Sequence, residues 1–118
     1  IPYVLEFNVR MGDPETQPIL FRMEGDLAET LLHLHNNEPH KAHIEWRPDP
    51  AICVVLASRG YPGAYEKGKL ISGLAELDAL PDVKAFHAGT ATDAAGNTVT
   101  SGGRVLGITA SGKTLTAC

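Results

Sequence analysis

Four polar residues near the start of the chain are placed to do chemistry together. Glu6 and Asn8 lie two residues apart in the otherwise apolar run 3–9, and Arg10 and Asp13 follow in the adjoining loop. Side chains at i and i+2 of a strand project from one face, about 7 Å apart along the chain. Mg²⁺ takes oxygen ligands and commonly shares them with substrate phosphates. Glu6 and Asn8 therefore fit a metal–ATP site, and the polar face of an exposed edge strand is the alternative.

The loop after this strand favours the site. Arg10, Asp13 and Glu15 would crowd three charges around the strand end that carries Glu6 and Asn8. The chain opens on Ile-Pro without an initiator methionine, directly before this strand, and its last residues begin a helical pattern. We expect from both ends that the chain is cut from a larger protein.

A second phosphate-binding pattern lies near the other end of the chain. Residues 107–114 match G-x-x-x-x-G-K-[ST]. A P-loop wraps phosphate in backbone N–H groups, and a long helix follows it. Only four residues follow Thr114, and residues 108–110 resemble a continuing strand. We expect a coincidental match, and a P-loop-like nucleotide binder is an alternative function.

Other polar groups have structural interpretations beside functional ones. His33, His35, His40 and His43 lie within eleven residues, but their spacing crosses an expected helix end and matches no standard zinc pattern, so we expect a solvated loop. His87 is expected to make structural hydrogen bonds.

The glycine-rich turn 101–103 leaves two interpretations open. It could approach a phosphate, or its glycines could serve tight strand packing. Arg104, directly after the turn, could reach an anionic partner.

Composition limits the function classes. The 118 residues suffice for one domain, or for a small domain plus part of another. The net charge of −4 argues against a general nucleic-acid binder, which needs a basic face. No apolar run approaches the roughly 20 residues that span a bilayer, and no secretory signal is recognised. Cys53 is expected to be a buried reduced thiol, which suits the cytoplasm.

The hydrophobic pattern predicts a mixed fold rich in strands. The expected elements are a strand at 3–9, a loop at 10–18, a helix capped by Asp26 and Glu29 that ends near His35, a strand buried on both faces at 51–57, strands at 69–72 and 83–87, a turn at 77–81, a hairpin loop at 93–97, a strand at 103–109 and a helix start at 111–118. Short strands with glycine turns from about residue 47 onward predict a small barrel or sandwich.

Together these stretches resemble the glycinamide ribonucleotide synthetases, or phosphoribosylamine–glycine ligases, which are ATP-grasp enzymes. The resemblance covers most of the chain in the family's order. It is carried by Tyr3–Pro18, Val54–Ser58, Gly60–Gly63, Tyr65–Gly68, Phe86–Thr90 and Val99–Ala110. Arg59 departs from the family, where a glycine or another residue is common before Gly-Tyr-Pro.

The resemblance implies an α+β, mostly β fold. Residues 1–46 would be the C-terminal remnant of an ATP-grasp domain, comprising its last strand, loop and helix. Residues 47–118 would be a small β-barrel or sandwich-hybrid-like C-terminal domain, truncated at its end. Glu6 and Asn8 would bind Mg²⁺ or Mn²⁺, and Arg10 and Asp13 would lie in the loop that faces the substrates.

The implied activity is ATP-dependent ligation of glycine to 5-phosphoribosylamine in purine biosynthesis. It gives glycinamide ribonucleotide, ADP and phosphate through a glycyl phosphate. The implied partners are ATP, glycine, 5-phosphoribosylamine and the missing N-terminal domains of the same cytoplasmic enzyme, with no nucleic acid or membrane. Alone, the fragment is expected to be inactive because positioning groups are missing. The alternative from another class is a stand-alone β-rich binding module without catalysis.

Overall fold

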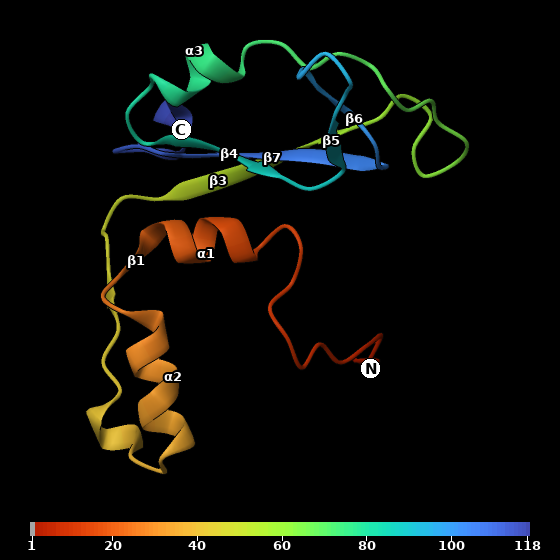
Figure 1. Cartoon of the computed structure of the whole chain (residues 1–118). Coiled ribbons are helices and arrows are strands. Elements are labelled where there is room, and N and C mark those ends of the chain that lie inside the picture. The colour runs from red at the N-terminus through yellow and green to blue at the C-terminus, as the bar shows by residue number, and fades with distance from the viewer. Residues whose placement is uncertain (1) are drawn as a thin grey trace.

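A central antiparallel sheet lies between α1 on one side and α3 on the other (Figure 1). The computed structural model describes residues 2–118. The elements in chain order are α1 (Thr16–Arg22), β1 (Met23–Glu24), α2 (Leu27–His35), the 3₁₀ turn η1 (Pro39–Lys41), β2 (Glu45–Trp46), β3 (Ala51–Ala57), α3 (Leu74–Asp78), β4 (Val83–His87), β5 (Thr90–Thr92), β6 (Thr98–Thr100), β7 (Arg104–Ser111) and the 3₁₀ turn η2 (Leu115–Ala117).

β7 is the middle strand of the central sheet, whose order is β3-β7-β4. It pairs antiparallel with both neighbours, so that Thr109 lies opposite Cys53 on one side and Lys84 on the other. The buried apolar side chains belong to β4 and β7: Ala85, Val105, Leu106 and Ala110. The expected strands at 51–57 and 83–87 are confirmed, and the last strand runs two residues beyond its expected end.

The expectation that residues 51–57 are buried on both faces is wrong. Val54 and Leu56 are 56% and 47% exposed. β3 is an edge strand of the sheet, and α1 packs against β3 and β7. The continuous apolar run correctly predicted a strand here, but it did not predict that one face of the strand is exposed.

The closed barrel expected for this region is not present among the described residues. The strands form one three-stranded sheet and two two-stranded sheets, β1-β2 and β5-β6. Residues 68–71 lie along β6 through the bonds Gly68 N–H to Thr100 O and Ile71 N–H to Thr98 O, but only Leu70 forms a bridge, opposite Val99. Because β3 and β4 each pair only with β7, the central sheet stays open, and the fold is a small sheet-rich α+β arrangement.

Of the three α-helices, the sequence predicted α2 and did not predict α1 or α3. α2 begins where expected, because the Asp26 carboxylate accepts hydrogen bonds from the amides of Ala28 (2.8 Å) and Glu29 (3.1 Å), and it ends at His35. α1 begins at the end of the expected loop. α3 precedes the turn predicted at 77–81 and overlaps it only at residues 77–78, and residues 79–81 form the turn. Both helices are short and lack a side-chain N-cap, so the usual start signals are missing. The expected helix start at 111–118 yields only η2.

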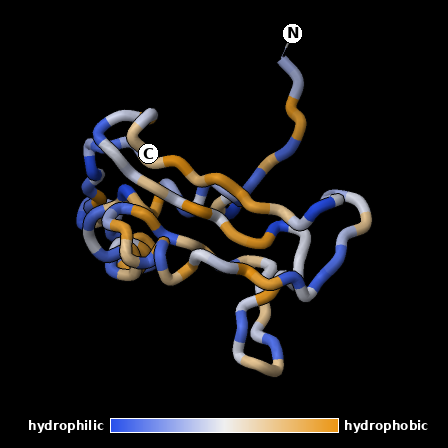
Figure 2. Tube along the Cα trace, turned by 90° about the horizontal axis from the view of Figure 1, so that it is seen from above, coloured by the Kyte–Doolittle hydropathy of each residue, from blue (hydrophilic) through white to orange (hydrophobic). Residues whose placement is uncertain are grey.

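The strand predicted at 3–9 is also wrong for this structure. The segment is extended but belongs to no sheet, and its apolar side chains are exposed, from 71% at Val4 to 97% at Val9. A strand requires a hydrogen-bonded neighbour, and no part of residues 2–118 lies beside this segment as one. Figure 2 shows the segment extending away from the rest of the molecule.

The molecule is more extended than a compact domain of its length. Its radius of gyration is 17.7 Å, against about 13 Å for a compact domain of 100 residues. The N-terminal segment and α2 account for the difference, because both extend away from the central sheet (Figure 1). No helix within residues 2–118 is long and apolar enough to cross a membrane.

The hairpin loop at 93–97, which the sequence predicted, generates a pH prediction. Hydrogen bonding from the backbone amide of Asn97, then from its side chain, holds the pKa of Asp93 below the ordinary 3.8. The ionised carboxylate thus stabilises the folded hairpin above pH 3.8, and this contribution is lost as the pH falls through the lowered pKa.

We therefore expect the β5–β6 amides to lose protection from hydrogen exchange as the pH falls below 3.8 and through the lowered pKa of Asp93. Asp93→Asn keeps an oxygen that can accept the amide bonds but removes the titrating charge, so its hairpin should show a weaker acid-dependent loss. Equal pH dependence of the two proteins would contradict the assignment to Asp93.

Candidate active site

The four predicted site residues lie in two groups along the N-terminal segment. Glu6 and Asn8 are exposed on the extended part, and the Asn8 amide nitrogen donates to the Glu6 carboxylate at 3.1 Å. Their side chains therefore lie on the same side, as the i, i+2 spacing predicts, although no strand is formed. This shared side is the feature that a metal site requires of them.

The donor set of this pair suits Mg²⁺ or Mn²⁺. A carboxylate and an amide supply oxygen ligands, and Mg²⁺ is usually bound through one or two carboxylates together with substrate phosphates and waters. Within residues 2–118 no group of three or more His, Cys, Asp and Glu side chains is arranged to hold a metal ion. Glu6 and Asn8 could supply two oxygen ligands to such an ion, and its other ligands would have to come from elsewhere.

The two loop residues have different partners. The Arg10 guanidinium donates to the Met11 carbonyl at 3.2 Å and is exposed. The Asp13 carboxylate forms an ion pair with Arg104 of β7, with 2.9 Å between Nη1 and Oδ2. The sequence left an anionic partner for Arg104 as one possibility and could not identify it, because the pair joins opposite ends of the chain.

The turn before α1 holds Asp13 at a defined place. Gly12 is buried, and its carbonyl accepts from both the amide and the hydroxyl of Thr16. A side chain at position 12 would meet the Glu15 carboxylate, 2.6 Å from its Oε2 atom. The exposed Glu15 carboxylate would move to admit a side chain at position 12.

α1 is placed on the sheet at a second glycine. A Cβ atom at Gly107 of β7 would lie 3.1 Å from the Cys53 sulfur and 3.7 Å from the Gln17 side-chain nitrogen. Gln17 of α1 therefore packs against β7 where the strand carries no side chain. Cys53 is a free thiol of intermediate exposure, rather than the fully buried one expected.

The glycine-rich turn 101–103 packs against an aromatic pair. A Cβ atom at Gly103 would lie 2.7 Å from Cε2 of Tyr61, and Tyr61 contacts Tyr65 edge to face with centroids 6.4 Å apart. The Ser58 hydroxyl donates to the Gly102 carbonyl at 2.7 Å. The packing interpretation of this turn is confirmed, because the Tyr61 ring occupies the approach to Gly103.

The P-loop alternative is contradicted. The first five residues of the 107–114 string lie in β7, paired on both sides over much of this length, so no loop wraps a phosphate. Lys113 forms an exposed ion pair with Asp49 at 3.1 Å, and Thr114 caps the three-residue η2 instead of a long helix.

The clustered histidines form no metal site in the described part of the chain. His33 of α2 lies 3.8 Å from Glu29 and 3.5 Å from Glu38, and His43 lies 3.0 Å from Glu45. His87, also expected to be structural, bonds Thr90 through its Nδ1 atom at 3.0 Å.

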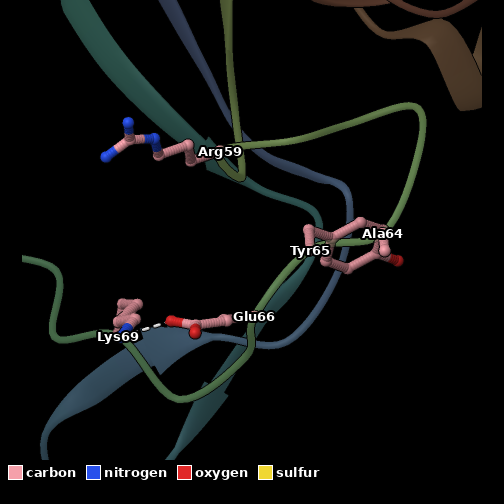
Figure 3. A pocket seen from close by; sticks show the side chains of 5 residues that line it. All are labelled: Arg59, Ala64, Tyr65, Glu66 and Lys69. Atoms are coloured by element: carbon pink, nitrogen blue, oxygen red, sulfur yellow. Dashed lines mark ion pairs between the residues drawn. The ribbon is translucent and has the colours of Figure 1, made fainter.

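A shallow depression of about 610 Å³ lies beside the aromatic pair. Figure 3 shows Arg59 on one side of it and the ion pair of Glu66 and Lys69, 2.6 Å apart, on the other. The bond from Lys69 lowers the pKa of Glu66, and the same bond raises the pKa of Lys69. Sequence reasoning treated Arg59 only as a departure from the family's turn.

Comparison with known proteins identifies the family. Residues 51–118, more than half of the chain, match the family model described as "Phosphoribosylglycinamide synthetase, C domain". The chain belongs to this family.

Relatives of the family match beyond the C domain. The chain is 52% identical over 116 residues to a phosphoribosylamine–glycine ligase of Pseudomonas aeruginosa, covering 98% of this chain and 27% of the relative. The chloroplastic ligase of Arabidopsis thaliana is also 52% identical over 98% of this chain, which spans 22% of it. The crystal structure of the Thermotoga maritima ligase matches with a TM-score of 0.69 and 40% identity, over 98% of this chain and 27% of that one.

The phosphoribosylglycinamide synthetase C-domain match has a boundary that bears on the site. It includes Arg104 but begins after Glu6, Asn8, Arg10 and Asp13. The relatives match 98% of the chain, so their similarity extends over these four residues as well. The chain spans about a quarter of the length of these relatives.

The packing of Tyr61 on Gly103 can be tested by substitution. Gly103→Ala should destabilise the chain by about 1–3 kcal/mol, because the added methyl group forces the Tyr61 ring to move. Gly103→Ala combined with Tyr61→Ala should cost less than the sum of the two single substitutions, because the second removes the clash. Urea unfolding measures all three variants. Additive free energies of unfolding would contradict the packing.

Proposed function

We propose that the chain forms the C-terminal part of an ATP-dependent ligase that joins glycine to 5-phosphoribosylamine. The products are glycinamide ribonucleotide, ADP and phosphate. The observation that carries the proposal is the 52% identity to relatives named phosphoribosylamine–glycine ligase over 98% of the chain. This similarity includes the polar N-terminal segment as well as the sheet, so it favours a shared active site over a shared fold alone.

Within this proposal residues 1–46 complete an ATP-grasp domain and residues 47–118 form the C-terminal domain. Glu6 and Asn8 would hold Mg²⁺ or Mn²⁺ where the phosphates of ATP bind. The metal supplies neutralisation of the charge that develops on the transferred phosphoryl group. The same-side placement of the two side chains supports this role.

Arg10 and Asp13 are proposed to bind the substrates beside the metal ligands. A glycine carboxylate oxygen attacks the γ-phosphorus of ATP, the bond from that phosphorus to ADP breaks, and a C–O–P linkage forms. The amine of 5-phosphoribosylamine then displaces phosphate from the acyl carbon and loses a proton. A guanidinium binds carboxylate and phosphate oxygens through paired N–H donors. Arg10 therefore suits the glycyl group, and the Asp13 carboxylate suits an amine.

The proposed partners are ATP, glycine, 5-phosphoribosylamine and the remaining part of the same enzyme. The net charge of −4 gives no support to a nucleic-acid partner. A reducing compartment such as the cytoplasm is proposed, with Cys53 and Cys118 both free thiols.

A hybrid enzyme tests the proposal. In it this chain replaces the matched region of the Pseudomonas aeruginosa ligase, and the unchanged ligase is the positive control. We expect the hybrid to form glycinamide ribonucleotide in the presence of Mg²⁺ and ATP. Glu6→Ala should lower kcat by at least about a hundredfold, because it removes charge neutralisation in the transition state. Glu24→Ala, which removes an exposed carboxylate paired with Arg47, is the matched control and should retain activity.

Two outcomes would contradict the proposal. One is a hybrid that unfolds in a single cooperative transition yet forms no product. The other is a Glu6→Ala hybrid as active as its Glu24→Ala control, which would favour the binding module without catalysis.

A further inference from the structure

One ion pair joins the predicted substrate loop to the C-terminal sheet. Asp13 precedes α1, and Arg104 begins β7 at the other end of the chain. Their side chains meet with 2.9 Å between Arg104 Nη1 and Asp13 Oδ2. Arg104 lies inside the region that matches the C-domain family and Asp13 lies outside it. The pair therefore bridges the two parts of the chain.

Arg104 projects from a well-fixed backbone. It lies opposite Ala57 in the β3–β7 register, and its carbonyl accepts from the Gly89 amide at 2.9 Å. The next residue, Val105, is 5% exposed and belongs to the buried core. The guanidinium thus extends from a strand end that is held on both sides.

The backbone of Asp13 lies in the turn that Thr16 closes on Gly12, and the segment before this turn is unpaired. The extended residues 3–9 belong to no sheet and are exposed, and the Asp13 side chain is 51% exposed. Within residues 2–118 the ion pair that involves Asp13 is the one with Arg104. The neighbouring cation, Arg10, bonds the Met11 carbonyl instead. The direction of the Asp13 carboxylate consequently depends on Arg104.

The magnitude of such a pair indicates where its effect lies. Both side chains are about half exposed, and an exposed ion pair adds little to the free energy of folding. The orientation of the Asp13 carboxylate can affect the reaction rate much more, because misplacing a substrate-binding group by about 1 Å can lower the rate about a hundredfold. The pair is therefore expected to matter for positioning much more than for stability.

We propose that Arg104 is a positioning residue of the ligase site: it fixes the Asp13 carboxylate, and with it the loop 10–15, at the start of the central strand β7. The inference rests on the proposed function for its catalytic consequence. Its structural half, the attachment of the loop by Arg104, is independent of any activity. The C-terminal domain would thus take part in catalysis by orienting a group on the loop before α1.

The structural half is tested on the 118-residue chain itself. Hydrogen exchange of the peptide that covers residues 10–16 should be at least about threefold faster in Arg104→Ala, since release of Asp13 loosens the turn. Lys113→Ala removes the ion pair with Asp49 just beyond the other end of β7 and should leave this peptide unchanged. Equal exchange in Arg104→Ala and the unchanged chain would overturn the proposal.

The catalytic half is tested by a double-mutant cycle in the hybrid ligase. Arg104→Ala should lower kcat/KM for glycinamide ribonucleotide formation by about ten- to a hundredfold while the KM for ATP changes little. Arg104→Lys should recover part of this loss, because it keeps the charge without the guanidinium geometry. In the Asp13→Asn background, Arg104→Ala should have no further effect, because the carboxylate it orients is already neutral.

The outcomes separate the two proposals. An unsubstituted hybrid that folds but makes no product contradicts the proposed function, whatever the exchange data show. An active hybrid in which the effects of Arg104→Ala and Asp13→Asn multiply independently overturns the positioning role, and indicates that Arg104 contacts substrate directly. An active hybrid unaffected by Arg104→Ala also overturns it.

Discussion

α1 packs against β7 at Gly107, which has no side chain. A Cβ atom at this position would lie 3.7 Å from the side-chain nitrogen of Gln17 in α1. One turn earlier in the chain, Asp13 pairs with Arg104 at the start of the same strand. β7 is the middle strand of the central sheet and pairs with both β3 and β4. These two contacts therefore attach α1 and the turn before it to the middle of the sheet. This attachment places Asp13, whereas Glu6, Asn8 and Arg10 lie on the exposed segment that precedes it.

Several large apolar side chains outside these contacts are exposed. The segment before the loop exposes Leu5 and Val9 almost completely, and the edge strand β3 exposes Val54. Apolar side chains exposed to this extent are compatible with surfaces that other protein covers. The chain spans about a quarter of the relatives it matches, so the rest of such an enzyme is the natural occupant in the proposed function. The charged groups of the loop would then lie between two protein parts, where ion pairs are less screened than in this exposed form.

Local signals in the sequence predicted those elements that local interactions form. The Asp26 cap, the hairpin loop at Asp93 and the strand 83–87 depend on neighbours within a few residues or on alternation, and all three are confirmed. The helix α1, the exposure of Val54 and the partner of Arg104 depend on which distant segments pack together, and periodicity carries no such information. The barrel was inferred from strand count, which does not say whether edges close. The spacing of Glu6 and Asn8 fitted a metal site and the polar face of an exposed edge strand equally well. The resemblance to a known family was needed to choose between them.

The central claim is that residues 6–13 form one edge of a metal–nucleotide site and that β7 holds this edge in place. A crystal structure of the hybrid ligase with Mn²⁺ and a non-hydrolysable ATP analogue measures both parts at once. The account predicts an anomalous manganese peak bonded to Glu6 and Asn8 and to the nucleotide phosphates, with the Asp13–Arg104 pair intact beside it. Manganese bound by other residues, with Glu6 and Asn8 facing solvent, would contradict it.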